Sequence, residues 1–282
     1  MNHERCDCRQ KTGVLRFRLM GIVLGLSALF GLSVCQSAKP LHDSAVPWGA
    51  PTETIRDGRM IIHQYPDHQV TLIAVPDTLH FIYFPANTRT VQETAEAEGW
   101  NYLVNASYFS GQRDLLKGYY TGIQHVGLLS IFGDSIAPIA EDKQLTHIIR
   151  YDRSQNRIDF YPYRDYQPQS GPDILEIQTG PLVIRDSRLD TASIDASING
   201  GRKAERTLVA SIDHRDKFLV IVREKMNLTE LGEYLLSLDL FRGKALDVIN
   251  LDGGSSTALY SRNHPELNFN LKSHLPFFLG VK

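Results

Sequence analysis

Short apolar runs separated by turn residues fill most of the chain from residue 60 onward. Met60–Tyr65, Val70–Val75 and His80–Phe84 are rich in β-branched and aromatic residues, with Pro-Asp pairs between them. This spacing predicts short strands joined by tight turns. By the same pattern, later strands are predicted at Tyr102–Val104, Thr146–Asp152, Arg157–Tyr163, Leu208–Ile212, Phe218–Val222, Ala245–Leu251 and Pro276–Val281.

Two segments have helical signals. Thr90–Trp100 is predicted to be a short helix, with Gly99 near its C-cap. Asn227 and Glu230 form a capping-box sequence ahead of a leucine-rich face, which predicts a second helix. Ser193–Glu205 is polar and predicted to be a loop. We therefore expect an α+β fold, a single mixed-sheet domain of many short strands with a few helices.

The N-terminal region differs from the rest of the chain. Arg16 and Arg18 precede an apolar segment, Leu19–Cys35, which is the pattern of a secretory signal. The segment ends in Leu-Ser-Val-Cys, which is similar to a bacterial lipobox and predicts lipidation of Cys35; an uncleaved signal-anchor is the alternative. Residues 1–35 are predicted to be this signal, 36–55 a tether, and 56–282 the folded domain. The expected location is periplasmic or cell-envelope, with the chain tethered to a membrane.

The positions of the cysteines and charges exclude some kinds of chemistry and partner for residues 36–282. All three cysteines, Cys6, Cys8 and Cys35, lie in the predicted signal, so the exported body has no disulfide and no thiol chemistry. Only two of the 32 acidic residues but five of the 30 basic ones lie in residues 1–35, so the body is mildly acidic. This balance argues against nucleic acid as a partner.

The richest chemical signal is the turn after the Ala245–Leu251 strand. Asp252-Gly253-Gly254 follows at once, and paired glycines allow a ligand to approach the backbone closely. A strand end would hold the Asp252 carboxylate rigidly, as a catalytic group requires. A plain β-turn in which the aspartate caps its own backbone is the alternative.

Other polar positions interrupt strands in the same way. Asn105 ends the Tyr102 strand, and Gly180-Pro181 breaks the apolar run Leu175–Leu182. His125 has no second histidine at metal-ligand spacing and is interpreted as a loop residue. No compact metal-ligand motif is present, so no cofactor is predicted, and a divalent cation stays open without a motif to support it.

Four separated segments resemble the phosphodiester glycosidase family. Asn250–Thr257 is similar to the family's N-L-D-G-G-x-S-[ST] signature, and Gln178–Leu182 to its Q-[ST]-G-P-L. Arg206-Thr207 resembles the family's R-T, and Asn105–Phe109 its N-G-G-[FY]-F. The order and rough spacing agree across Tyr102–Tyr260, more than half of the chain.

The resemblance implies hydrolysis of a sugar-1-phosphate diester at the anomeric carbon, on a cell-envelope or polysaccharide substrate. Asp252 would act as base or nucleophile, and Arg206 would hold phosphate in a bidentate fork. The implied substrate-binding residues, with the sugar held by the two amides and phosphate by the glycine turn, are Asn105, Gln178, Thr179, Gly180, Asn250, Gly253, Gly254, Ser256 and Thr257.

Two other function classes remain open. A metal-dependent phosphodiesterase would cut the P–O bond, with Asp252, Asp213 and His214 as its only candidate ligands. A non-catalytic envelope lipoprotein would bind glycan in the same place without turnover.

Overall fold

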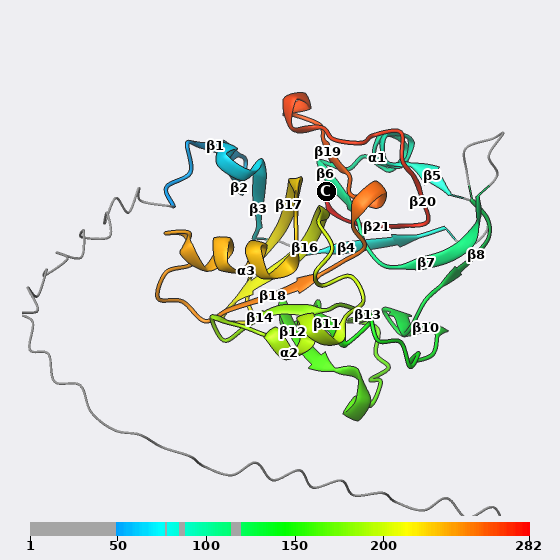
Figure 1. Cartoon of the computed structure of the whole chain (residues 1–282). Coiled ribbons are helices and arrows are strands. Elements are labelled where there is room, and N and C mark those ends of the chain that lie inside the picture. The colour runs from blue at the N-terminus through cyan, green and yellow to red at the C-terminus, as the bar shows by residue number, and fades with distance from the viewer. Residues whose placement is uncertain (1–48, 77, 85–87, 114–119) are drawn as a thin grey trace, which may run out of the picture. The chain divides into compact units, whose positions relative to one another are not determined.

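The computed structural model describes residues 49–76, 78–84, 88–113 and 120–282 (Figure 1). The predicted signal, Cys35 and most of the predicted tether lie outside these residues. Residues Val46–Lys282 form one compact unit. In the described ranges, no helix has the length and apolar character needed to cross a membrane.

The largest sheet has eight strands in the order β1-β2-β3-β17-β16-β18-β14-β15. Its bounds are β1 Glu53–Asp57, β2 Met60–Tyr65, β3 Val70–Val75, β14 Leu182–Arg185, β15 Arg188–Leu189, β16 Ala204–Ile212, β17 Asp216–Met226 and β18 Leu246–Asn250. Strand β1 begins at Glu53, so the last residues predicted as tether belong to the sheet instead. Their polar character hid this edge strand from the apolar pattern.

Four smaller sheets complete the fold. The five-stranded sheet has the order β10-β9-β13-β11-β12, with β9 Leu129–Ile131, β10 Asp134–Ala137, β11 His147–Asp152, β12 Arg157–Pro162 and β13 Ile174–Thr179. The four-stranded sheet has the order β19-β6-β21-β4, with β4 His80–Tyr83, β6 Tyr102–Asn105, β19 Leu259–Ser261 and β21 Phe277–Val281. Two-stranded ribbons pair β5 Arg89–Thr90 with β20 His274–Leu275, and β7 Phe109–Arg113 with β8 Tyr120–His125.

The α+β class predicted from the sequence agrees roughly with the structure, but the mixed sheet predicted for the domain is wrong. Every strand pairing among the described residues is antiparallel, and the strands divide into five sheets. Short connections such as the one between β16 and β17 force antiparallel pairing, because a parallel pair needs a crossover of a dozen or more residues. The fold is therefore dominated by antiparallel sheets, with helices as a minor part.

Three α-helices occur in the described part of the chain: α1 Val91–Glu98, α2 Thr191–Ala196 and α3 Leu228–Ser237. The predicted capping box of α3 is present, since Asn227 Oδ1 accepts from the Glu230 N–H at 2.8 Å and the Glu230 carboxylate accepts from the Asn227 N–H at 3.3 Å. Helix α1 ends at Gly99 in the left-handed conformation, as predicted. Helix α2 falls where a loop was predicted; its N-cap is Asp190, whose side chain accepts from the Ser193 N–H at 2.9 Å.

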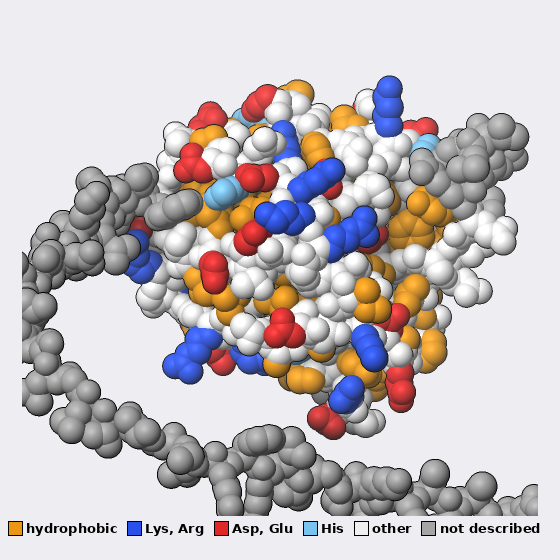
Figure 2. Space-filling model, viewed as in Figure 1, with side chains coloured by type: hydrophobic (Ala, Val, Ile, Leu, Met, Phe, Trp, Pro, Cys, Tyr) orange, Lys and Arg blue, Asp and Glu red, His pale blue; other side chains and the backbone are white. Residues whose placement is uncertain are grey.

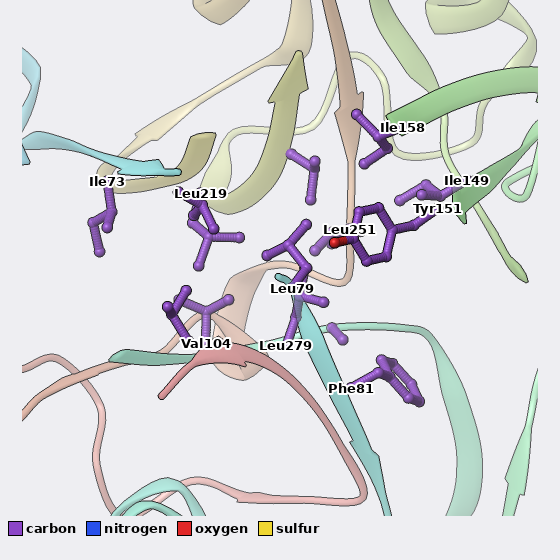
Figure 3. Close-up of a cluster of buried hydrophobic side chains, with 14 of the residues drawn as sticks. Ile73, Leu79, Phe81, Val104, Ile149, Tyr151, Ile158, Leu219, Leu251 and Leu279 are labelled. Atoms are coloured by element: carbon purple, nitrogen blue, oxygen red, sulfur yellow. The ribbon is translucent and has the colours of Figure 1, made fainter. Parts of the chain in front are cut away.

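The large sheet is buried on both faces. Leu219 and Ile249 point into a cluster shared with the four- and five-stranded sheets, which Figure 3 shows with side chains such as Val104 and Ile149 converging. Val220 and Val248, one position along, point to the opposite face and pack with α2 and α3. This double burial explains why β16, β17 and β18 read as continuous apolar runs. It also makes the end of β18 a rigid platform.

Candidate active site

Strand β18 delivers Asp252 to the surface of the compact unit. Leu251 before it is buried, whereas Asp252 is partly exposed. The Asp252 Oδ1 atom accepts from the Gly253 N–H at 2.9 Å, and the Ser256 side chain also bonds the carboxylate. Burial raises the pKa of Asp252 to about 6, and these two hydrogen bonds oppose that rise. The group is therefore ionised at neutral pH but close to its protonation point, which suits a general base or a nucleophile.

The backbone of Asp252 is fixed from both sides by the strand end that carries Asn105. Its N–H donates to the Ala106 carbonyl at 3.1 Å, and its carbonyl accepts from Asn105 Nδ2 at 2.6 Å. The Asn105 Oδ1 atom accepts from Thr207 Oγ1 at 2.6 Å and from the Ala258 N–H at 3.1 Å. Because Asn105 is only 2% exposed, its amide holds three segments together and does not present itself to a sugar. The sequence-based role of Asn105 in orienting sugar hydroxyls is not supported.

Arg206, on β16, lies behind the glycine turn. A Cβ built on Gly253 would lie 3.6 Å from Arg206 Cδ. Arg206 is 3% exposed, and its guanidinium donates to three backbone carbonyls: Nε to Met226 at 3.4 Å, and Nη2 to Asn199 at 3.1 Å and to Arg202. Because Nε and Nη2 both donate to backbone carbonyls in this structure, they are not free to form the predicted bidentate fork on phosphate. No carboxylate lies within ion-pair distance of Arg206 among the described residues, so its charge is uncompensated beside the Asp252 turn.

A third buried group joins β18 to the Gly180-Pro181 break. The Asn250 Nδ2 atom donates to the Tyr108 hydroxyl at 2.8 Å and to the Gly180 carbonyl at 3.2 Å. The Thr179 hydroxyl donates to the Asn250 carbonyl at 2.9 Å. Asn250 and Thr179 are fully buried and Gly180 is buried as well, so in this structure the three residues support the turn from within the core.

Gln178 was predicted as a site residue, but its side chain bonds the backbone of residues 128–145 and not the turn that carries Asp252. Its Oε1 accepts from the N–H groups of Leu128 and Ala140, both at 2.9 Å. Its Nε2 donates to the carbonyls of Ala140 at 2.7 Å and Leu145 at 3.1 Å. All four hydrogen-bonding positions of the amide are satisfied and the side chain is 0% exposed. Gln178 therefore fixes two loops and cannot bind sugar.

Most backbone N–H groups of the glycine turn form hydrogen bonds within the turn itself. Besides Gly253, the N–H groups of Ser256 and Thr257 bond within the turn, at 3.3 Å and 3.0 Å. Thr257 is fully buried, and its hydroxyl has no partner among the described residues. Of the turn residues predicted to hold phosphate, Gly253, Gly254 and Ser256 are partly exposed. Gly253 is required because an added Cβ would lie 2.9 Å from the Glu205 carbonyl.

Comparison with known proteins identifies the family of this chain. A family model of phosphodiester glycosidases matches residues 98–282. The chain belongs to the phosphodiester glycosidase family. The matched range contains Asp252 and every other site residue predicted from the sequence except Cys35. No curated protein matched this sequence significantly.

Two solved structures share the fold of this family member. The catalytic domain of zebrafish N-acetylglucosamine-1-phosphodiester α-N-acetylglucosaminidase, auto-inhibited by its pro-peptide, aligns with a TM-score of 0.55 at 16% identity, over 81% of this chain and 80% of that one. A protein of Burkholderia pseudomallei described as exported aligns with a TM-score of 0.50 at 12% identity, over 83% of this chain and 75% of that one. At these identities the likeness concerns the fold alone.

Sequence reasoning gave no role to Tyr108 or to the pairing of Ser107 with His125. The Tyr108 hydroxyl lies 3.0 Å from the carbonyl oxygens of both Gly180 and Leu251, which share its one proton. Burial together with the Asp252 charge raises the pKa of Tyr108. The His125 Nδ1 atom bonds the Gly127 carbonyl at 2.8 Å, and its Nε2 bonds the Ser107 hydroxyl at 2.7 Å.

The Ser107–His125 pair has a defined protonation pattern. Because a carbonyl can only accept, Nδ1 of His125 carries the proton and Nε2 accepts from Ser107. Burial lowers the pKa of His125 to about 4, so the ring is neutral at neutral pH. The sequence offers no signal for this pair, since 18 residues separate its members. Among the described residues no cluster of His, Cys, Asp and Glu suits a metal ion.

Proposed function

We propose that this protein hydrolyses a sugar-1-phosphate diester at the anomeric carbon. The observation that carries the proposal is the partly exposed Asp252 carboxylate, on a residue whose backbone is fixed by Ala106 and Asn105. The glycine turn that follows it packs against the Arg206 side chain. Membership of the phosphodiester glycosidase family supports the same reaction.

The reaction suits a site with a single well-placed carboxylate. When water attacks the anomeric carbon, the C1–O bond breaks and its electron pair leaves with the phosphate monoester. A phosphate monoester has a second pKa of about 6 and needs no proton from a general acid. The proton of the attacking water passes to Asp252 and then to solvent. In the nucleophile variant, Asp252 attacks first and water then hydrolyses the glycosyl ester.

Arg206 serves this reaction as a fixed charge. A buried cation without a carboxylate partner stabilises the negative charge that grows on the leaving phosphate, and it needs no rearrangement to do so. Its three carbonyl contacts hold the guanidinium in place.

The proposal is tested with purified Asp252→Asn on a GlcNAc-1-phosphodiester. We expect turnover to fall by about 10³ or more, since the base or nucleophile is lost. Asp247→Asn is the matched control: Asp247 lies on the same strand, burial raises its pKa too, and it is at the end remote from the turn. Full activity in Asp252→Asn, or equal loss in both variants, would refute the assignment.

The two alternatives predict different products. A metal-dependent phosphodiesterase loses turnover with a chelator and releases the sugar as its phosphate. A non-catalytic glycan-binding lipoprotein binds the diester in calorimetry but yields no product. Chelator-resistant release of free sugar favours the glycosidase over both.

We further propose that the protein is exported and acts on envelope or polysaccharide-linked sugar phosphates. The support is the signal-like segment Leu19–Cys35, which lies outside the described residues. The mass of the mature N-terminus distinguishes a cleaved and lipidated Cys35 from a retained anchor.

A further inference from the structure

Two hollows flank the turn that carries Asp252. One, of about 430 Å³, lies between Arg202–Glu205, Lys225 and the Gly254-Ser255 edge of the turn. The other, of about 300 Å³, lies against Lys272–Leu275. Ser255 and Asn270 line both hollows, so the two meet across the turn. We call the combined surface the turn groove.

The turn groove is cationic on an acidic protein body. Its basic side chains are Arg202, Lys203, Lys225 and Lys272, against the single acidic side chain of Glu205. All four basic residues are exposed. Figure 2 shows Lys and Arg side chains gathered on this face, between helix α3 and the turn.

Existing ion pairs neutralise only part of this charge. Lys203 Nζ lies 3.0 Å from Glu230 Oε1, and Lys225 Nζ lies 3.9 Å from Glu205 Oε1. Arg202 and Lys272 have no carboxylate within 4 Å in the part of the chain that the structure describes. These two cations, one on each side of the turn, are available to a ligand.

The reacting phosphate group alone does not explain why basic side chains line both hollows. The reacting phosphate has the charge of Arg206 beside the turn, whereas the groove cations are spread over two hollows on both sides of Ser255. A ligand that meets Arg202 and Lys272 together must carry anionic groups on either side of the reacting bond or along an extended aglycone. Beyond Lys203 and Lys225 the surface turns acidic, with Glu224, Glu230 and Glu233 lining the next hollow. An anionic chain is disfavoured there and confined to the groove.

We propose that the turn groove binds an aglycone carrying further phosphate groups, so that the substrate is a chain of sugar-phosphate or polyol-phosphate units. This inference rests on the proposed function for the reaction, but the groove itself can be tested without turnover.

The kinetic test compares two substrates with the same GlcNAc-1-phosphate. One has a methyl aglycone, and the other a glycerol-phosphate trimer. We expect the full-length protein to prefer the trimer in kcat/KM. In Arg202→Gln/Lys272→Gln the preference should fall by about fivefold, because each exposed charge pair contributes a few tenths of a kcal/mol to about 1 kcal/mol. The preference should also shrink as salt rises, because exposed charges are screened.

Lys244→Gln is the matched control. Lys244 is an exposed lysine just before β18, at the end of that strand opposite Asp252, and it should leave the preference unchanged. Circular dichroism of the double variant checks that the exposed substitutions leave the fold intact.

Calorimetry with the free glycerol-phosphate trimer separates the two proposals. Trimer binding that weakens in the double variant, without hydrolysis of either substrate, sustains the groove and defeats the proposed reaction. Hydrolysis of both substrates with equal kcat/KM would overturn the proposed role of the groove. Equal binding of the trimer by the wild type and the double variant would overturn it as well. Binding to anionic phospholipid vesicles but not to the trimer overturns it too, since the cations would then serve a membrane surface.

Discussion

At the scale of single residues, the amides of Asn105, Gln178 and Asn250 have a structural role in this protein. Each is almost completely buried and bonds backbone groups of distant segments. They look like substrate ligands in the sequence because turn-associated amides serve both purposes. Only the hydrogen-bond partners of an amide distinguish a structural role from substrate binding. Those partners lie up to 153 residues away in the sequence, as with Asn105 and Ala258.

Asn105→Ala should lower both stability and activity. The change removes three hydrogen bonds and leaves the Ala258 N–H and Thr207 hydroxyl without their acceptor in the interior, which costs about 3 kcal/mol of unfolding free energy. Asp252 loses its carbonyl anchor, so kcat should fall as well. Urea unfolding and initial rates check this, with the exposed Asn263→Ala as control. A stable but inactive Asn105→Ala would instead indicate direct contact with substrate.

The Asp252 carboxyl predicts the acid limb of the pH profile. Since its pKa is raised to about 6, kcat/KM should fall below about pH 6 as the base is protonated. The sign for stability is opposite: a raised carboxyl pKa means that the folded state loses stability as pH rises from about 4 through 6. Asp252→Asn should remove this loss in urea titrations. An acid limb near pH 4 in the wild type would contradict a raised Asp252 pKa.

At the scale of elements, apolar periodicity located the strands that are buried on one or both faces. β2 and β3 match their predicted bounds, and β6, β11, β16, β17, β18 and β21 were found within a few residues or as parts of longer strands. The missed elements have polar or short sequences: the edge strand β1, the β7–β8 ribbon, the β9–β10 hairpin and helix α2. Local pattern carries little information for such elements because neighbouring parts of the fold stabilise them.

The turn between β18 and β19 should be intolerant of side chains at Gly253. Gly253→Ala places a Cβ 2.9 Å from the Glu205 carbonyl, so the turn must shift away from β16. We expect a loss of about 1–3 kcal/mol in stability and a fall in kcat of about tenfold or more through displacement of Asp252. Gly201→Ala, whose added Cβ meets nothing within 4 Å, is the control for the loss of glycine. Equal behaviour of both variants would show that the close approach is unimportant.

At the scale of the whole molecule, the sequence predicted which segments belong together but not how the sheets are arranged. The four family-like segments converge as expected, since Asn105, Thr179 and Arg206 all lie around the backbone of residues 250–253. The division into five antiparallel sheets depends on strand order, and periodicity within a strand does not specify its neighbours.

Residues 46–282 should fold and act without the N-terminal region. They form one compact unit, and the predicted site lies wholly within them. The truncated chain should keep the turnover of the full chain and lose the membrane association that we propose for residues 1–35. Thermal unfolding, rates and fractionation measure these properties. Loss of folding in the truncated chain would assign a structural role to residues 1–45.

The central claim is that the bond between the anomeric carbon and oxygen is cleaved at Asp252. Hydrolysis of a GlcNAc-1-phosphodiester in ¹⁸O-labelled water tests this most directly, with mass spectrometry of both products. Cleavage at carbon puts the label on the sugar and leaves the phosphate monoester unlabelled, which is the result this account predicts. Label in the phosphate would mean that the P–O bond breaks, and it would contradict the glycosidase assignment.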